Sequence, residues 1–574
     1  MDKEESESYD DDSVVINFYS SVWHLENLIY ICGKIITKKN IYMKKIITCS
    51  LVFLLLAFVA VAQKSLPDDI VEKIKKEAFE NSKMESLTFY LTDYAGPRLT
   101  ASRLWERSEQ LTKEKLTELG FSNVRIEKAA DFPRGGWDNL KTYAAMTAPY
   151  YCNFMAMPKA WSGGTGGSIS GEVVLLEVSD PEDIEKYKGK ISNKIVLMPA
   201  TSSYRMQFTP LATRVTDERL EQLASIDPRN STQQQQARAP RPQADSVRPQ
   251  ADSTLRAAAA SQVARRQSTN ELVRNLLAQE RPAVLVSGSG SFNVPSSSNV
   301  SYRFGDPEPV AELVLPVEAH NRMVRMIKNN IPVSMEVEIK NEFYDNRVVN
   351  NVIAEIVGTD PKLKDEIVLI GGHLDSWHGG TGAADNASGC AVMMEALRII
   401  KDIGVKPRRT IRIALWGGEE QGLIGSSGYA RDYIFDVTEN VPRKGHEQFA
   451  LYLNMDNGSG KFRGIYLERN DMAIPFFKQW TKTLESIGFG VLSLGTTGGT
   501  DHLSFDRYGL PAFQFIQDAL EYSRGYHTPM DTYERLIMDD LKYNAAIVAS
   551  LALSAAMDDG KIPAKPYTPP QRRQ

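Results

Sequence analysis

The sequence predicts an α/β protein in which a mainly parallel, mixed sheet is sandwiched by helices and a separate β-rich domain is inserted before it. After about residue 346, apolar runs of strand length alternate with runs of helix length. From residue 131 to 345, short β-type runs are separated by Gly, Ser and Pro clusters. With 574 residues and 42% hydrophobic side chains, the chain can bury more than one core.

The first 62 residues predict export. Residues 1–42 open with the acidic run MDKEESESYDDD, and we expect a disordered or non-native extension before the true start at Met43. Residues 43–62 have the pattern of a signal peptide, with two lysines, an apolar run and a final Ala-Val-Ala. An uncleaved anchor is the alternative, but the run is short for a bilayer span. We therefore expect a secreted or periplasmic protein without stable membrane insertion after signal cleavage.

The next two regions differ in their periodicity. From Asp68 to about Leu119 apolar residues recur at helical spacing, as in DDIVEKIKKEAFE, and Gly120 is the expected stop. We therefore expect residues 63–130 to be an N-terminal segment of helices that pack on the C-terminal domain. Residues 131–345 contain GEVVLLEV, NKIVLMP, PAVLVSG and VSMEVEI, which predict strands of the inserted domain. Inside it, residues 229–270 hold a glutamine run and the repeats RPQADSV and RPQADST. Because such polar sequence buries too little apolar area to offset its ordering entropy, we predict a disordered insertion.

Residues 346–574 predict the sheet itself. The runs DEIVLIGG, RRTIRIALW and FALYLNMD are expected strands, and ASGCAVMMEALRII and DDLKYNAAIVASLALSAAM are expected helices. Continuous apolar strands between helices are typical of a parallel sheet covered on both faces, where sites gather at the carboxyl ends of strands. Ligand-type side chains occupy these ends or the loops beyond them: His373, Asp375, Asp385, Glu419, Glu420, Asp456 and His527.

These side chains suit a pair of zinc ions. Two divalent ions about 3.5 to 4 Å apart need a shared carboxylate and further ligands on each side. Asp385 is the candidate bridge, with His373 and Asp456 on one ion and Glu420 and His527 on the other. We expect two zinc ions, although other divalent metals suit similar ligands.

Two further residues have expected roles beside the ions. Asp375 lies two residues beyond His373, and we expect its carboxylate to orient the second imidazole nitrogen. Glu419 is expected to be the general base, which takes a proton from water and passes it to the departing amine.

Each motif alone also has a structural explanation. An aspartate before a helix is commonly an N-cap, which applies to Asp385. The pair Glu419 and Glu420 could form a solvated turn, and His527 could pack on the surface. Together, however, five ligand-type residues at successive strand ends favour a dinuclear metal site.

Other residues remain open at this point. Asp501 and His502, in TTGGTDHLSFDRYG, could contribute to substrate binding or only to loop structure. His378 is expected to be an exposed loop histidine. Cys152 and Cys390 could form a disulfide, but two distant cysteines are more typical of separate buried residues.

At these residues the sequence resembles the M28 family of metallopeptidases. The resemblance implies Asp385 as the bridge and Glu419 as the base, and it adds Tyr526 as a donor to the oxyanion of the tetrahedral intermediate. A tyrosine that packs under its neighbour is the alternative. The matching motifs are HLDS at 373–376, GAADNASG at 382–389, GGEEQGLIGS at 417–426, NMDNGSG at 454–460 and YHTPMDTYE at 526–534.

The resemblance extends over most of residues 65–560. The segments YAGPRLTAS and KYKGKISNKIVLM are similar to those of carboxypeptidase Q-like peptidases that carry a protease-associated (PA) domain. This similarity implies a zinc exopeptidase fold with a PA-like insert at 131–345. The repeats at 229–270 depart from that pattern.

The sequence therefore predicts a secreted dizinc exopeptidase, acting as an aminopeptidase or dipeptidase on short peptides through metal-activated water. A single-zinc glutaminyl cyclase-like acyltransferase and a non-enzymatic receptor on the same fold are the alternatives. The complete ligand set and the base argue against both. A net charge of −5 gives no basis for binding nucleic acid, so we expect short peptides as partners and leave a homodimer open.

Overall fold

The computed structural model describes residues 65–227, 229 and 253–567, which belong to one compact unit. Side chains of residues 253–266 are outside this description. The predicted N-terminal extension and signal peptide also lie outside the described residues.

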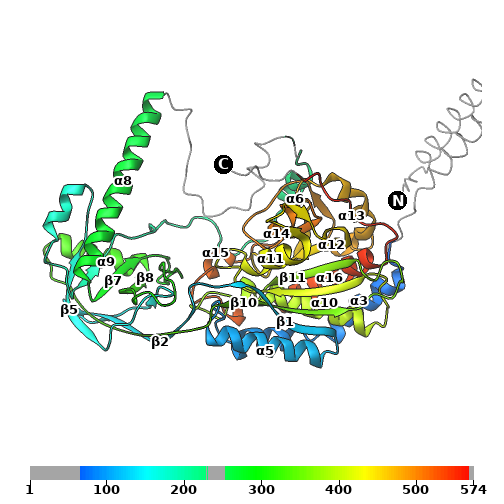
Figure 1. Ribbon diagram of the computed structural model, residues 1–574, viewed down its shortest axis with the longest axis horizontal. Coiled ribbons are helices and arrows are strands. Elements are labelled where there is room, and N and C mark those ends of the chain that lie inside the picture. Colours follow the sequence, from blue (N-terminus) through cyan, green and yellow to red (C-terminus); the bar gives the residue numbers. More distant parts are fainter. Residues whose placement is uncertain (1–64, 228, 230–252, 568–574) are drawn as a thin grey trace, which may run out of the picture. The chain divides into compact units, whose positions relative to one another are not determined.

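The larger domain is built on a mixed eight-stranded sheet (Figure 1). Its central strands run parallel, whereas the outer ones include antiparallel pairs, so that four of its seven pairings are parallel. This arrangement confirms the predicted mainly parallel, mixed sheet. In order across the sheet, the strands are β1 (Ser122–Asp131), β10 (Val348–Ile356), β12 (Thr410–Trp416), β11 (Ile367–His373), β15 (Phe449–Asn454), β18 (Ala512–Gln517), β16 (Phe462–Tyr466) and β17 (Val491–Ser493).

Helices cover both faces of this sheet, as Figure 1 shows. Successive residues of β11 face opposite layers: Val368 and Ile370 join one buried cluster, and Leu369 joins the other. Burial on both faces explains why this strand is continuously apolar. One layer contains α3 (Asp68–Glu80), α4 (Met84–Phe89), α5 (Arg103–Glu118), α10 (Ser388–Asp402), α13 (Ile474–Thr481) and α16 (Met538–Met557); the other contains α11 (Ile424–Tyr429), α12 (Lys444–Gln448) and α14 (Leu503–Asp506).

The N-terminal region supplies both helices and a strand. Helices α3 and α5 confirm the helical periodicity predicted from Asp68 to about Leu119. Residues 122–131 form the edge strand β1, paired with β10, although the segment 63–130 was described as helices only. The run SNVRIEKAAD carries several charges and does not alternate cleanly between buried and exposed positions, so its strand pattern is weak.

The inserted domain has its own eight-stranded sheet and core. The second sheet agrees with the β-type runs predicted for this region, while its PA-like identity and its bounds stay predictions. Helix α9 (Val317–Lys328) packs on β7, and the core includes Val286, Leu313 and Val337. In order, the strands are β3 (Cys152–Asn153), β2 (Gly136–Ala148), β9 (Ser334–Tyr344), β5 (Ile169–Leu175), β6 (Ile195–Leu197), β7 (Val284–Gly288), β8 (Ala311–Leu315) and β4 (Met157–Pro158).

Two parts of the predicted insert behave differently from expectation. Helix α8 spans Ser253–Glu280, so the prediction of disorder for 229–270 is wrong from residue 253 onward. Its alanine-rich start has a high intrinsic helix propensity, which outweighs the low complexity. Residues 230–252 lie outside the described part. Helix α6 (Asp217–Ala224) packs on β17 of the larger domain, although the boundary 131–345 assigns it to the insert.

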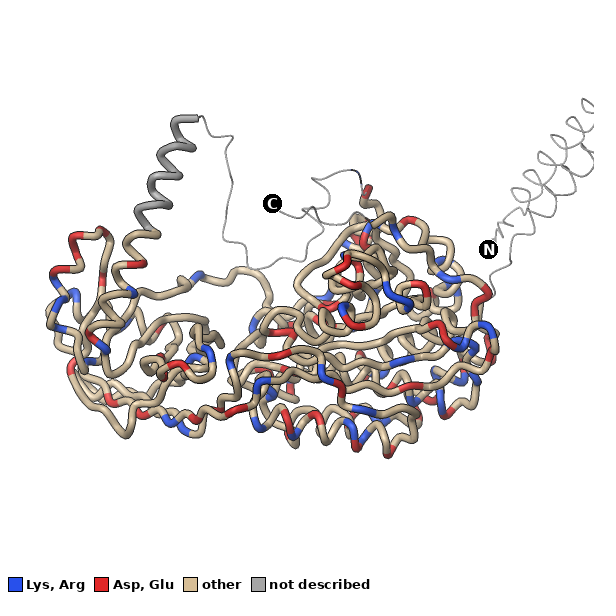
Figure 2. Tube along the Cα trace, viewed as in Figure 1, with Lys and Arg blue, Asp and Glu red and all other residues tan. Residues whose placement is uncertain are grey.

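The remaining elements are short, and within the described residues they form no further domain. Strands β13 and β14 pair only with each other. Figure 2 shows Lys and Arg interspersed with Asp and Glu in both domains. No helix in the described residues is long and apolar enough to cross a bilayer. The short elements are β13 (Phe435–Asp436), β14 (Val441–Pro442), α15 (Tyr522–Gly525), η1 (Tyr90–Tyr94), η2 (Pro181–Lys186), η3 (Ala383–Ala387), η4 (Ala430–Ile434), η5 (Asp471–Ala473), η6 (Glu485–Ile487) and η7 (Tyr533–Arg535).

Candidate metal centre

The fold brings the five predicted metal ligands together at the carboxyl ends of the central strands. His373 is the last residue of β11, and Asp456 follows β15 by two residues. Glu420 lies in the turn after β12, Asp385 in the loop after β11, and His527 in the loop after α15. The loops of parallel strands converge at this edge, which is where the sequence placed them.

The carboxylate of Asp385 lies between the two imidazoles. Its Oδ1 is 3.2 Å from Nε2 of His373, and its Oδ2 is 3.5 Å from Nε2 of His527. Oδ1 of Asp456 is 3.5 Å from Nε2 of His373, whereas Oε2 of Glu420 is 2.9 Å from Nε2 of His527. The ligands therefore divide into the two predicted sets, and Asp385 is shared by both.

The donor atoms of this cluster fit metal ions. Ligand atoms of His373, Asp385 and Glu420 all lie within 4.8 Å of one another. Nε2 of His373, Oδ2 of Asp385 and Oε1 of Glu420 are buried without a hydrogen-bond partner among the described residues. Buried polar atoms without a partner cost free energy of folding. The convergence of these three atoms is therefore best explained by metal cations to which they bind.

The pKa values of Glu420 and His373 are shifted by the same group of closely spaced carboxylates. Burial raises the pKa of Glu420, and the neighbouring Asp385 raises it further. Burial lowers the pKa of His373, but the carboxylates of Asp456 and Glu419 outweigh burial and raise it well above its usual value. A cation at this position would relieve the repulsion among the carboxylates.

Asp385 does not cap a helix. Helix α10 begins at Ser388, its N-cap residue is Ala387, and no side chain caps it. The N-cap explanation is therefore excluded for Asp385, whose carboxylate points to the imidazoles instead.

Asp375 supports the site through atoms other than those expected. Nδ1 of His373 bonds to the main-chain carbonyl of Asp375 at 3.0 Å, while the carboxylate is 3.7 Å away. That carboxylate accepts from the backbone N–H groups of Glu419 and Glu420, at 3.1 and 3.3 Å, and from Oγ1 of Thr100. The predicted orientation of the imidazole by the carboxylate was wrong in this detail, because the carboxylate holds the Glu419 turn.

A buried arginine that the sequence did not single out holds the loop after β11. Arg98 is fully buried and donates to the carbonyl oxygens of Leu374, Thr381 and Gly382. Gly382 has a φ of +59°, a conformation that favours glycine. The motif YAGPRLTAS contains this arginine, but a lone arginine in sequence gives no sign that it will bind carbonyl groups.

Asp531 and Trp377 also orient ligands, and sequence reasoning missed both. The carboxylate of Asp531 accepts from the backbone N–H groups of Ala384 and Asp385, at 2.6 and 3.0 Å. Nε1 of Trp377 donates to Oε2 of Glu420 at 2.8 Å. Asp531 lies inside the quoted segment YHTPMDTYE, so its proximity to His527 was the available signal.

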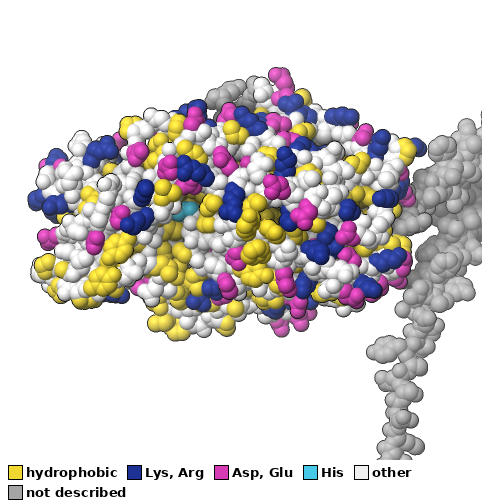
Figure 3. All heavy atoms as spheres, turned by 90° about the horizontal axis from the view of Figure 1, so that it is seen from below, with side chains coloured by type: hydrophobic (Ala, Val, Ile, Leu, Met, Phe, Trp, Pro, Cys, Tyr) yellow, Lys and Arg dark blue, Asp and Glu magenta, His cyan; other side chains and the backbone are white. Residues whose placement is uncertain are grey.

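The inserted domain contacts the loop of a metal ligand. The backbone N–H of Ser297 donates to the carbonyl oxygen of His527 at 2.7 Å, and His527 has a φ of +58°. The prediction that His378 is exposed was wrong, because the side chain is half-buried: its Nε2–H donates to the carbonyl oxygen of Pro158 at 2.8 Å, and its ring packs against Trp137. In Figure 3 a histidine side chain is visible in a hollow flanked by hydrophobic groups.

The predicted base and the tyrosine lie beside the ligands. Burial raises the pKa of Glu419 well above its usual value, and Asp456 raises it further although His373 opposes this. The ring of Tyr526 stacks on that of His527, with centroids 3.6 Å apart, and remains 45% exposed. Burial and Asp385 raise the pKa of Tyr526, so its hydroxyl stays protonated and can donate.

Asp501 and His502 are fully buried, so neither presents an atom to a substrate in this arrangement. Their predicted part in substrate binding is not supported. Burial raises the pKa of Asp501 to about 7.

Cys152 and Cys390 are both free, which excludes the disulfide between them.

The comparisons with known proteins agree with this geometry. Residues 351–552 match the model of peptidase family M28. Carboxypeptidase Q from Mus musculus is 24% identical over 487 residues, covering 84% of this chain and 88% of that protein. Aminopeptidase YwaD from Bacillus subtilis (strain 168) is 29% identical over 230 residues, covering 39% of this chain and 49% of that protein.

A solved structure supports the fold. The crystal structure of a peptidase M28 precursor from Shewanella amazonensis SB2B has a TM-score of 0.60 and 24% identity, covering 87% of this chain and 99% of that one. The matched family segment contains all five ligands and the predicted base. Residues 351–552 therefore form a peptidase region of the M28 type, and the relatives and the ligand cluster support a zinc metallopeptidase.

Proposed function

We propose that the protein is an exported exopeptidase that hydrolyses short peptides with two divalent metal ions, zinc by preference, bridged by Asp385. The position of Asp385 carries this proposal. One carboxylate oxygen faces His373 and the other faces His527, and each imidazole has its own second carboxylate. A single metal ion would leave one imidazole and one carboxylate without a role.

The residues around the ligands have distinct tasks in hydrolysis. Zinc ions held there would act as Lewis acids that activate water and polarise the scissile carbonyl. Glu419 takes the proton from the attacking water and delivers it to the leaving amine, a role favoured by its raised pKa. Tyr526 donates its hydroxyl hydrogen to the oxyanion that forms on the carbonyl oxygen.

Short peptides are the substrates that this site favours. The cavity at the ligands is small and is lined by Trp377, Gly380 and His527, among others. The inserted domain bounds it, because Ser297 contacts the His527 loop and Met157 would lie within 2.6 Å of a Cβ at Gly379. Export rests on the signal-like residues 43–62, and we propose neither nucleic acid nor a membrane as a partner.

The decisive test combines metal analysis with a peptide panel. We expect about two zinc ions per chain, loss of hydrolysis on chelation and recovery with zinc. Dipeptides, N-blocked peptides and longer peptides then distinguish aminopeptidase from dipeptidase action. One zinc ion together with cyclisation of N-terminal glutamine would instead support the glutaminyl cyclase alternative. A zinc-loaded protein that binds peptides without cleaving any of them would support the receptor alternative.

A further inference from the structure

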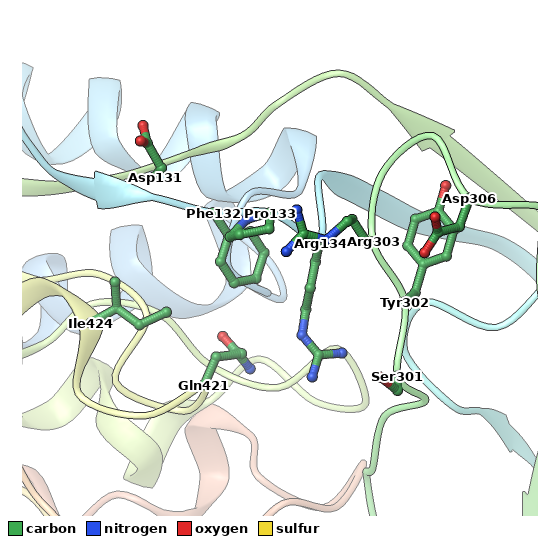
Figure 4. Close-up of a pocket in the computed structure, with 10 residues that line it drawn as sticks. All are labelled: Asp131, Phe132, Pro133, Arg134, Ser301, Tyr302, Arg303, Asp306, Gln421 and Ile424. Carbon is green, nitrogen blue, oxygen red and sulfur yellow. The ribbon is translucent and has the colours of Figure 1, made fainter. Parts of the chain in front are cut away.

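A second cavity, of about 590 Å³, opens beside the metal centre (Figure 4). Three segments line it: residues 131–134 after β1, loop residues 301–306 of the inserted domain, and the turn that carries Gln421 and Ile424. Gln421 directly follows the metal ligand Glu420 in the chain. The cavity therefore lies at the junction of the two domains and borders the catalytic turn.

Arg134 brings a positive charge to this cavity without a matching carboxylate. One N–H, at Nη1, donates to the carbonyl oxygen of Val300 at 2.6 Å, and the guanidinium lies 5.0 Å from the centre of the Trp161 ring. No carboxylate of the described residues lies within ion-pair distance of it, and burial alone lowers the pKa of Arg134. Its other N–H groups have no acceptor within the described part of the chain.

Gln421 brings an amide group that is also without a partner. Both Oε1 and Nε2 of Gln421 are buried and make no hydrogen bond among the described residues. A buried amide without hydrogen-bond partners costs free energy. Figure 4 shows the Gln421 amide and the Arg134 guanidinium directed into the same space.

The remaining charges of the cavity do not neutralise this pair. Asp131 is already paired with Lys128 at 2.7 Å. In Figure 4 Asp131 and Asp306 lie at the outer edges of the view, whereas Arg303 lies nearer to Arg134. The space between the arginines and Gln421 therefore favours an anion that can accept several hydrogen bonds.

One side chain joins this cavity to the metal centre. Trp377 lines the small cavity at the ligands and donates to Glu420. Its ring also belongs to the buried cluster that contains Phe132, which lines the second cavity. Glu420 and Gln421 are consecutive and line one cavity each, so a peptide bound at the ligands can extend along this turn toward Arg134.

We propose that Arg134 and Gln421 bind the free α-carboxylate of the peptide substrate. A carboxylate accepts two N–H bonds from a guanidinium and a third from Nε2 of the amide, so it satisfies both groups at once. This inference rests on the proposed peptidase function and specifies its substrate class, short peptides with an unmodified carboxyl terminus.

The test compares three peptides of one length: Ala-Ala as the free acid, Ala-Ala amide, and Ala-Glu amide, whose only carboxylate is in a side chain. The zinc-loaded full chain is compared with Arg134→Met, Arg134→Lys and the control Arg325→Met, in which an exposed arginine of α9 is replaced. We expect the acid-to-amide ratio of kcat/KM to fall about tenfold to a hundredfold in Arg134→Met and less in Arg134→Lys. Arg325→Met should keep the ratio of the unmodified protein.

The outcomes separate the inference from the function on which it rests. An unchanged acid-to-amide ratio in folded, zinc-loaded Arg134→Met, or an Arg134 effect confined to Ala-Glu amide, would overturn the carboxylate assignment and leave the peptidase standing. Absence of zinc-dependent cleavage of all three peptides by the unmodified protein would overturn both. If Arg134→Met does not fold, inhibition of the unmodified protein decides: an N-methylated Ala-Ala acid must inhibit at least about tenfold better than its amide.

Discussion

Consecutive residues, Glu420 and Gln421, line two cavities that differ in size, charge and origin. The cavity at Glu420 is small, and imidazoles and carboxylates of the α/β domain surround it. The cavity at Gln421 is about 590 Å³, and both domains contribute to it, including Arg134 and Arg303. If both proposals hold, the sheet positions the metal ligands, and the junction of the domains selects the substrate.

The largest expected effect concerns the bridging carboxylate. Asp385→Asn keeps the shape of the side chain but removes the charge shared between the two ligand sets. We expect kcat/KM to fall at least about 10³-fold and zinc content to drop below two per chain, measured by peptide hydrolysis and elemental analysis. Asp471→Asn, at an exposed position, is the control. Retention of two zinc ions and full activity would show that the small cavity is not the catalytic centre.

The next change separates catalysis from metal binding within the same cavity. Glu419→Gln removes the base but no metal ligand, so we expect kcat to fall about 10² to 10⁴-fold with nearly unchanged zinc content. The measurement is single-substrate kinetics on protein of known metal content. Full activity of this variant would refute the role of the base, and parallel loss of zinc would make Glu419 a ligand instead.

Trp377 tests the wall of the small cavity, where it contacts Glu420. Trp377→Phe keeps an aromatic ring but removes the N–H that donates to Glu420. Partners that orient metal ligands contribute about 10- to 100-fold to metal affinity or activity, and we expect a loss in that range in a zinc titration against a chelator. Trp480→Phe is the matched control, because its N–H donates to Asp558 at 3.0 Å far along the sheet. Equal losses in both variants would contradict a specific role for Trp377.

The smallest expected effect concerns the stability of the junction. Burial lowers the pKa of His378 from 6.5 to about 4, so the unfolded chain binds more protons than the folded one between these values. This contribution is present above pH 6.5 and is lost as pH falls toward 4, by an amount on the order of 2 kcal/mol. We expect His378→Gln to lose less thermal stability than the unmodified protein between pH 7 and 4.5. An equal loss of thermal stability in both proteins would show that His378 does not cause this pH dependence.

The sequence could bring part of the candidate ligand set together, because His373 and Asp456 lie at or just beyond the ends of clear apolar strands. Strand ends in a parallel sheet converge by topology alone, so His373 and Asp456 could be placed together without any side-chain geometry. The supporting residues were missed for the opposite reason. Arg98 and Asp531 act on backbone groups of distant loops, and no local pattern reveals which loops will meet.

Errors in the fold have equally specific causes. Strand β1 was not predicted, because its charged run does not alternate cleanly between buried and exposed positions. Residues 253–270 were assigned to a disordered repeat by composition, whereas α8 begins at Ser253. Which oxygen of Asp375 contacts His373 depends on the conformation of the turn between them. Spacing in the sequence cannot distinguish the main-chain carbonyl oxygen of Asp375 from its side-chain carboxylate.

The ladder between β1 and β10 has a consequence for how such a protein could arise. Asp131 pairs with Val348, and the N–H of Phe132 donates to the carbonyl of Arg347 at 2.8 Å. The inserted domain thus leaves the sheet at the end of β1 and rejoins it at the start of β10, where paired residues lie about 5 Å apart. Any unit whose own termini meet at that spacing could join the sheet here without altering the ladder, but it would also have to replace the contact of Ser297 with the His527 loop.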